Sequence, residues 1–207
     1  QQELLDALLS GQSVVALAHG EPGSRYSLSH VETSATASAD GFVLNGNKAV
    51  VISGDSADHV LVSARLSGAV DDAEGLSLFI VPRDADGVHV RGYPTVDGYR
   101  AAEIALHDVH IGSDSLVGEQ GNGLALLDKA NAAGTLAVSA EALGAIEVAI
   151  DMTLEYLKTR KQFGVPIGKF QALQHRMADM MTEREQIRSA VINAAGHLHT
   201  DQRDWHL

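Results

Sequence analysis

The chain falls into two parts that differ in the spacing of their hydrophobic positions. Up to about residue 116, short apolar stretches recur roughly every ten residues and are separated by Asp-Gly, Asn-Gly and Gly-Asp pairs. This pattern is typical of an antiparallel β-sandwich or barrel rather than a parallel nucleotide-binding sheet. The expected strands cover 14–18, 33–38, 41–46, 48–53, 58–65, 76–81, 88–90 and 100–107. A short helix over 2–9, stopped by Gly11, is expected to precede them.

A different period governs the second part. From Gly123 to about Thr159 nearly every turn carries Ala, Leu, Val or Ile, which predicts one long helix. Apolar residues repeat along it at heptad spacing, so the helix is expected to pack in a bundle and to be largely buried. One seam of the repeat comprises Leu136, Leu143, Ile150 and Leu157, and the other seam contains Ala140 and Leu154. A second helix over about 168–196 is expected to offer Leu173, Met177, Met180, Ile187, Val191, Ala194 and Ala195 to that bundle.

Two helices cannot close a bundle, so other chain segments, another subunit, or both must supply the missing faces. We therefore expect a dimer or tetramer that forms through the 123–196 helices. The chain starts at Gln1 without a methionine and has no helix stop at its end, which suggests a piece of a longer protein. The predicted class is α+β, with 1–11 as the end of a helical region or linker, 12–116 as a β-domain and 117–207 as an incomplete helical domain.

Composition narrows the possible partners. The 207 residues are 45% hydrophobic and carry a formal charge of −12, and the excess acid lies in the first 120 residues. A nucleic-acid partner would need a basic face, so none is expected. No stretch of about twenty uninterrupted apolar residues suggests a membrane span. The absence of cysteine excludes disulfides and thiolate metal sites and is compatible with a reducing cytoplasm.

The candidate chemistry concentrates where the two helices meet, from Lys158 to His175. Gly164, Pro166 and Gly168 break the helical pattern there, and cations, amides and aromatic rings flank the break. Arg160 offers a forked donor for phosphate, and nearby amide and aromatic side chains could border a planar ring. The alternative is that the cations cap the first helix and the rings pack in the core.

Other candidates favour structural roles. Gly118-Glu-Gln-Gly-Asn-Gly123 lacks a parallel βαβ context and is interpreted as a turn into the long helix. His107 and His110 are expected at the surface, and the scattered histidines predict no metal site. Glu141 and Glu147 interrupt the apolar helix, so each needs a partner, a raised pKa or a place on a rim that faces solvent or another subunit.

The helical junction closely resembles a known signature. Arg160-x-Gln-Phe-Gly-x-Pro-Ile-x-x-Phe-Gln-x-x-Gln-His175, followed by Met177-Ala-Asp-Met180, is similar to the acyl-CoA dehydrogenase family. Glu21-Pro-Gly23, Gly41-Phe-Val-Leu-Asn-Gly-Asn-Lys48 and Gly54-x-x-Ala57-Asp58 follow the family order, and the chain looks most like the small subunit of a pimeloyl-CoA-type dehydrogenase. The resemblance implies the middle β-domain and the first half of a four-helix domain.

The same resemblance implies FAD as cofactor and oxidation of an acyl-CoA thioester to a trans-2-enoyl-CoA. It assigns FAD contacts to Arg160, Gln162 and Phe163, offered from a neighbouring subunit, and to Phe170, Gln171 and Gln174 at the start of the next helix. Gly20, Glu21 and Gly23 would line the flavin ring. It further implies a homo- or hetero-tetramer, an acceptor similar to electron-transfer flavoprotein, and a cytoplasmic or mitochondrial-matrix location.

The chain departs from the family pattern at several positions. Gly20 replaces the usual Thr, Arg25-Tyr26-Ser27 replace a Gly-Ser-Asp, and Val50-Val51-Ile52 replace a Trp-Ile-Thr. The catalytic base of the family, a Glu, would lie beyond this chain or at the position of Gly134, and Thr135 replaces an Arg. Two functions therefore stay open: an FAD-dependent dehydrogenase subunit, or a non-catalytic partner that completes the flavin site of another subunit.

Overall fold

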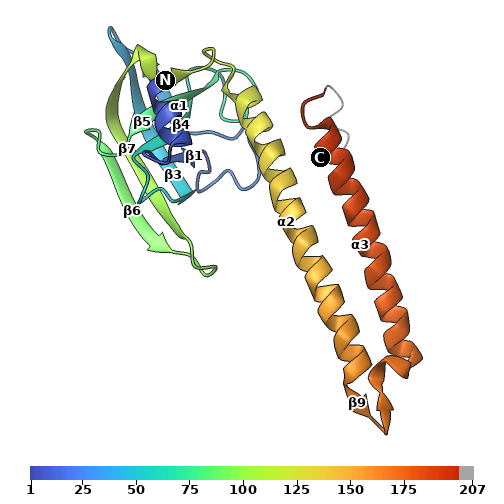
Figure 1. Cartoon of the computed structure of the whole chain (residues 1–207). Coiled ribbons are helices and arrows are strands. Elements are labelled where there is room, and N and C mark those ends of the chain that lie inside the picture. The colour runs from blue at the N-terminus through green and yellow to red at the C-terminus, as the bar shows by residue number, and fades with distance from the viewer. Residues whose placement is uncertain (201–207) are drawn as a thin grey trace. The chain divides into compact units, whose positions relative to one another are not determined.

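The computed structural model describes residues 1–200, which form two compact units (Figure 1). The β unit comprises Gln1–Asp128, and the helical unit begins at Lys129. The first turns of the long helix belong to the β unit, because Leu127 is buried against Leu76 and Leu78 of that unit.

One curved eight-stranded sheet makes up most of the β unit, after the short helix α1 (Gln2–Leu9). The strands are β1 (Val15–Ala18), β2 (Ser34–Ala37), β3 (Gly41–Ile52), β4 (His59–Arg65), β5 (Leu76–Pro82), β6 (Val88–Pro94), β7 (Arg100–Gly112) and β8 (Leu116–Val117), with the 3-10 turn η1 (Ser113–Ser115) before β8. The order is β6-β7-β3-β2-β4-β5-β8, with β1 on β4. Pairing is antiparallel except for β1 on β4 and one β2–β4 bridge. The sheet is not closed, but the predicted antiparallel α+β class is confirmed.

One sequence prediction was wrong in detail: the Asn45-Gly46 pair is not a hairpin turn. It lies inside the single long strand β3, at an irregularity in the pairing with β7. Gly46 has φ +153°, and a Cβ there would lie 2.5 Å from the Thr33 hydroxyl, so glycine permits a close approach of two strands. Asn45 exchanges hydrogen bonds with Asp108 across the bulge, at 3.0 and 2.8 Å.

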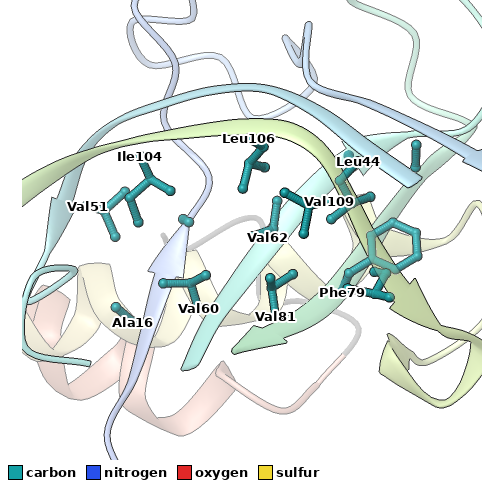
Figure 2. Packing of buried hydrophobic residues seen from close by; sticks show 14 of the residues in the cluster. Ala16, Leu44, Val51, Val60, Val62, Phe79, Val81, Ile104, Leu106 and Val109 are labelled. Carbon is teal, nitrogen blue, oxygen red and sulfur yellow. The ribbon is translucent and has the colours of Figure 1, made fainter. Parts of the chain in front are cut away.

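The core of the β unit lies inside this curved sheet (Figure 2). Side chains of the four strands β3, β4, β5 and β7 point inward, largely at alternate positions as period-2 patterning requires. Leu44, Val51, Val60, Val62, Phe79, Val81, Ile104, Leu106 and Val109 are all buried. Phe42 and Phe79 pack with ring centroids 4.9 Å apart. This unit therefore encloses an apolar core of its own.

The helical unit is an antiparallel pair (Figure 1). Helix α2 (Gly123–Thr159) and helix α3 (Gln171–His197) run side by side, as predicted. Between them lie the two-residue strands β9 (Lys161–Gln162) and β10 (Val165–Pro166), followed by the 3-10 turn η2 (Ile167–Lys169). An ion pair between Glu147 and Arg188 joins the helices, so Glu147 has the partner that its place in an apolar helix requires.

Burial of α2 differs from the prediction. Of its predicted seam, Ile150 is buried, whereas Leu136, Leu143 and Leu157 are only partly covered and Ala140 is exposed. On α3, Met177 and Ala194 are buried and Ala195 is exposed. The reason is geometric, since one neighbouring helix can cover only one side of a helix that is apolar nearly all round.

Among the described residues, α2 is also long and apolar enough to cross a membrane by length and composition alone. The core helix of a soluble bundle meets the same criterion. The expectation of no membrane span, which rests on the lack of about twenty uninterrupted apolar residues, therefore stays a prediction.

Candidate functional site

The first group of predicted site residues lies on the loop that follows β1. The Glu21 carboxylate is buried and points into the β unit, where it accepts four hydrogen bonds. Oε2 accepts from the Glu32 backbone N–H at 2.6 Å, and Oε1 accepts from the Thr33 N–H at 3.0 Å, the Thr33 hydroxyl at 2.6 Å and Lys48 Nζ at 2.6 Å. Both carboxylate oxygens of the predicted site residue Glu21 are thus engaged. A ligand beside this loop would therefore meet its backbone rather than the Glu21 side chain.

Lys48 closes this network from β3. Its ammonium group is fully buried and donates to Glu21, to the His19 carbonyl at 3.3 Å and to Ser63 Oγ at 3.0 Å. Ser63 Oγ also lies 2.9 Å from His19 Nδ1. These contacts join the loop to two strands of the sheet.

Burial and mutual charge set the protonation of this network. Burial by itself raises the pKa of the Glu21 carboxyl, but the Lys48 charge and the hydrogen bonds from Lys48, Thr33 and Glu32 hold that pKa below its ordinary value. Burial lowers the pKa of Lys48 to about 8, against the opposing charge of Glu21. Burial and the Lys48 charge lower the pKa of His19 to about 4. At neutral pH the pair is therefore ionised and His19 is neutral.

The glycines of this loop permit a close backbone path. The Gly20 carbonyl accepts from the Ala49 N–H at 2.7 Å, and a Cβ on Gly20 would lie 3.2 Å from the Ala49 carbonyl oxygen. A hollow of about 200 Å³ adjoins the loop, lined by Glu21, Pro22, Gly23, Glu32, Thr33, Gly46 and Asn47. Gly20, Glu21 and Gly23 are thus together, on a loop that β3 holds in place.

The second group surrounds the tip of the helical hairpin. Gln162 pairs with Val165, which leaves Phe163 and Gly164 as a two-residue turn with φ +53° and +79°. Both central residues have positive φ, as a type I′ turn requires. The Ile167 N–H donates to the Arg160 carbonyl at 2.8 Å and closes the base of the tip.

Side chains at this tip lie at the surface of the described structure. Within residues 1–200, no hydrogen bond or ion pair uses the side chains of Arg160 or Gln162, which are both exposed. Phe163 is 91% exposed and meets Phe170 only edge-on, with ring centroids 6.1 Å apart. The alternative in which Arg160 caps the helix has no contact to support it, since no carbonyl accepts from its guanidinium in the described part of the chain.

The start of α3 places the remaining candidates beside the tip. Phe170 stands at the N-cap position, and its carbonyl accepts from the backbone of Leu173 at 3.0 Å. Gln174 Nε2 donates to the Gly168 carbonyl at 2.8 Å, so this amide is partly engaged in the turn, whereas Gln171 is exposed. The structure brings together all six residues predicted on the hairpin.

An apolar groove of about 510 Å³ adjoins these residues between the two helices. It is lined by Leu154, Leu157, Lys158, Pro166, Gly168, Lys169, Gln174, Met177, Ala178 and Met181. Lys158 and Lys169 border this mostly apolar groove. Such a lining is compatible with a ligand that has a flat apolar part and an anionic part.

Sequence reasoning missed the buried polar network that anchors the loop after β1. His19, Thr33, Lys48 and Ser63 carried no site prediction, although Lys48 stands directly before the apolar stretch 49–52 of β3. A lysine at an inward position of a buried strand requires an anionic partner, and this signal could have pointed to Glu21. As predicted, His107 and His110 are exposed and Gly118–Gly123 leads into α2.

Comparison with known proteins gives the class of this arrangement. The acyl-CoA dehydrogenase middle domain matches residues 16–111, and the acyl-CoA dehydrogenase C-terminal domain matches residues 121–206. Both domains of one family thus match in order, and the chain belongs to the acyl-CoA dehydrogenase family.

Individual relatives agree with this assignment. A probable acyl-CoA dehydrogenase of Bacillus subtilis is 33% identical over 94% of this chain and 52% of its own length. A 3-(aryl)acrylate reductase of Clostridium sporogenes is 31% identical over 94% of this chain and 52% of its own length. A solved structure of PigA with FAD and proline matches with a TM-score of 0.87 at 27% identity, over 93% of this chain and 51% of that one. The chain spans about half the length of these relatives.

Proposed function

We propose that this chain is part of an FAD-dependent acyl-CoA dehydrogenase that oxidises an acyl-CoA thioester to the trans-2-enoyl-CoA, and that it supplies two parts of an FAD site. Family membership supports the reaction class, and the FAD named with the PigA structure supports the cofactor. The relative described as a 3-(aryl)acrylate reductase shows that family members differ in substrate. The acyl group is therefore left general.

The observation that carries the proposal is Arg160 on a hydrogen-bonded hairpin tip, where its side chain is exposed and has no hydrogen bond or ion pair within residues 1–200. A guanidinium fork matches two phosphate oxygens at once, and neighbouring Gln162 and Phe163 could add amide and ring contacts. Phe170, Gln171 and Gln174 would continue the same surface. The loop with Gly20, Glu21 and Gly23 would present its backbone to the flavin ring, because the Glu21 carboxylate already serves inside the β unit.

The reaction needs a base, a polarised carbonyl and a hydride acceptor. When bound, FAD supplies the acceptor for the hydrogen that leaves Cβ. The α-proton requires a carboxylate, and the position in α2 where some family members are expected to carry it is Gly134. We assign the base to a Glu outside this chain.

Replacement of Arg160 tests the cofactor assignment. In the full-length protein, Arg160→Ala should weaken FAD binding by roughly ten- to a hundred-fold, since a forked bond to a charged oxygen contributes about 1.5–3 kcal/mol. The melting temperature of the apo-protein should hardly change. The matched control is Arg176→Ala on the exposed side of α3, which should leave FAD binding as it is. A less stable apo-protein with normal FAD content would make Arg160 structural and contradict the proposal.

A non-catalytic partner subunit is the second candidate. It is favoured by Gly134 and Thr135, which leave that part of α2 without a carboxylate or an Arg. Anaerobic mixing of purified protein with acyl-CoA separates the two candidates. If the protein alone bleaches the visible absorption of the flavin, a catalytic subunit is favoured. Bleaching only after a partner subunit is added favours the second candidate.

We further propose a homo- or hetero-tetramer, an acceptor similar to electron-transfer flavoprotein, and a location in the cytoplasm or mitochondrial matrix. Exposed apolar side chains along α2 support assembly, including Val138 at 65%, Val148 at 59% and Met152 at 69% exposure. Such a surface favours contact with another protein surface. Light scattering should find an oligomer at micromolar concentration, and a stable, non-aggregating monomer would contradict this part of the proposal.

A further inference from the structure

Lys48 is one of the largest fully buried side chains among the described residues. A buried ammonium group is costly unless it is paired, and Glu21 provides the pair at 2.6 Å. Replacement of such a pair by apolar side chains is often neutral or stabilising. Stability alone therefore does not explain why a charged pair occupies this position, and the geometry around it gives another reason.

The pair fixes the loop after β1 from two directions. Lys48 reaches the loop through the His19 carbonyl at 3.3 Å and through the Glu21 carboxylate at 2.6 Å. On the other side, that carboxylate accepts from the backbone N–H groups of Glu32 and Thr33. Glu21 thus lies between β3 and the segment that leads into β2, and hydrogen bonds from both sides hold its side chain.

Further contacts pass this constraint to the loop backbone. The Glu21 N–H donates to Ser24 Oγ at 3.0 Å, and the Ser24 hydroxyl and N–H reach the Glu21 carbonyl at 3.0 and 3.1 Å. The Ala49 N–H, next to Lys48, holds the Gly20 carbonyl at 2.7 Å. The segment Gly20–Ser24 is therefore held to β3 at Gly20 and closed on itself by Ser24, and the buried Glu21 side chain anchors it between these two points.

We propose that Lys48 is a positioning residue for the cofactor: through Glu21 it fixes the backbone of Gly20–Ser24 in the conformation that borders the flavin ring. This inference rests on the proposed FAD function. Lys48 and the Glu21 carboxylate touch no ligand themselves, because both are enclosed within the β unit. Their effect on the flavin acts through the shape of the loop.

A purely structural role and a positioning role predict different results for a charge-free core. Lys48→Met alone leaves the Glu21 carboxylate buried without its cation, so the apo-protein should melt several degrees lower and FAD binding should weaken. In the double variant Glu21→Gln/Lys48→Met no charge is stranded, and the Gln oxygen can still accept from Glu32 and Thr33. Most of the lost melting temperature should therefore return in the double variant.

FAD binding to the double variant decides the question. If Lys48 positions the loop, full-length double variant should bind FAD at least tenfold more weakly than the wild type, equivalent to about 1.4 kcal/mol. The visible circular dichroism of the bound flavin should also change, because its protein surroundings differ. Lys129→Met, the same change at an exposed residue of α2, should alter neither quantity. Wild-type affinity and spectrum in the double variant would overturn the inference and leave the FAD proposal intact.

Two further results keep the outcomes distinct. Thr33→Val conserves shape and removes only the 2.6 Å hydroxyl bond to Glu21, so it serves if the double variant does not fold; it should weaken FAD binding about threefold at a nearly unchanged melting temperature, equivalent to roughly 0.65 kcal/mol. Unchanged affinity in Thr33→Val would then overturn the inference. A wild-type protein that takes up no FAD would overturn the proposed function and this inference together.

Discussion

The β unit and the helical unit bury their apolar side chains to very different extents. In the β unit, Phe79, Val60, Leu44 and many other inward side chains have no exposed surface. In the described helical unit, only Ala132, Ile150, Met177 and Ala194 are buried apolar residues. Both sequences are rich in apolar residues, so the contrast comes from how many faces each element must cover. A curved sheet encloses its own inner face, whereas two helices leave most of theirs open.

The two units also differ in how far their charged side chains are buried. In the β unit, an ion pair is buried with all its hydrogen bonds made, and Arg65 donates to five backbone carbonyls, those of Ser29, Val31, Val70, Asp72 and Glu74. In the helical unit, Glu147 and Arg188 are about two-fifths exposed. Buried polar groups thus fix loop shape in the β unit, whereas Arg160 and Gln162 of the helical unit are exposed.

The largest expected effect tests the contrast in packing. Phe79→Ala should lower the free energy of unfolding of the β unit by about 3–5 kcal/mol, because it leaves a cavity beside Phe42. The control is Tyr156→Ala on α2, where the ring is 57% exposed, and its cost to unfolding of the β unit should be under about 0.5 kcal/mol. Chemical denaturation followed by circular dichroism measures both. An equal loss of unfolding free energy in both variants would show that the two units do not differ in how tightly these side chains are packed.

Acidification should weaken the β unit through His19. The folded-state pKa of His19 is about 4, against 6.5 when unfolded, so between these values the unfolded chain binds more protons and stability falls as pH falls. Below this window, protonation of Glu21 removes the stability that its lowered pKa provides. His19→Asn, which cannot titrate and can still bond to Ser63, should flatten the loss between pH 6.5 and 4. An unchanged slope in unfolding experiments would refute the role of His19.

The tip of the helical unit should gain stability from a change that harms its proposed function. Phe163 has φ +53° in a turn that favours Asn-Gly, so Phe163→Asn should stabilise the apo-protein by roughly 0.5 kcal/mol. The same change removes a ring proposed to contact FAD, so FAD binding should weaken. Melting of the apo-protein and FAD titration measure the two effects. A stabilised tip that binds FAD normally would show that Phe163 serves no cofactor.

The smallest effect is expected at the ion pair between the helices. Both groups are partly exposed, so Glu147→Gln, Arg188→Met and the double change should give only a small coupling energy, less than the stability change expected at Phe163. High salt should reduce it further. A double-mutant cycle in denaturant unfolding measures this energy. A coupling several times larger would place the pair in a buried interface of the assembled protein.

Sequence alone predicted much of the local structure. Period-2 and helical patterning located the antiparallel strands, the long helix α2 and the break before α3, because those periods follow from backbone geometry. The signature around Arg160 predicted the family, which the comparisons confirm. The Asn45-Gly46 pair was misread, since an Asn-Gly pair gives the same local signal in a hairpin turn and in a bulge that admits a neighbouring strand.

Only the tertiary structure decided which polar groups meet. Glu21, Thr33, Lys48 and Ser63 come from separate segments, and no spacing along the chain reveals that they share one buried cluster. Patterning likewise predicted that α2 is apolar but not how much of it a single neighbour covers. The physical reason is the same for both. Periodicity records which face of an element avoids water, whereas long-range contacts depend on how the sheet curves and which segments it brings within hydrogen-bonding distance.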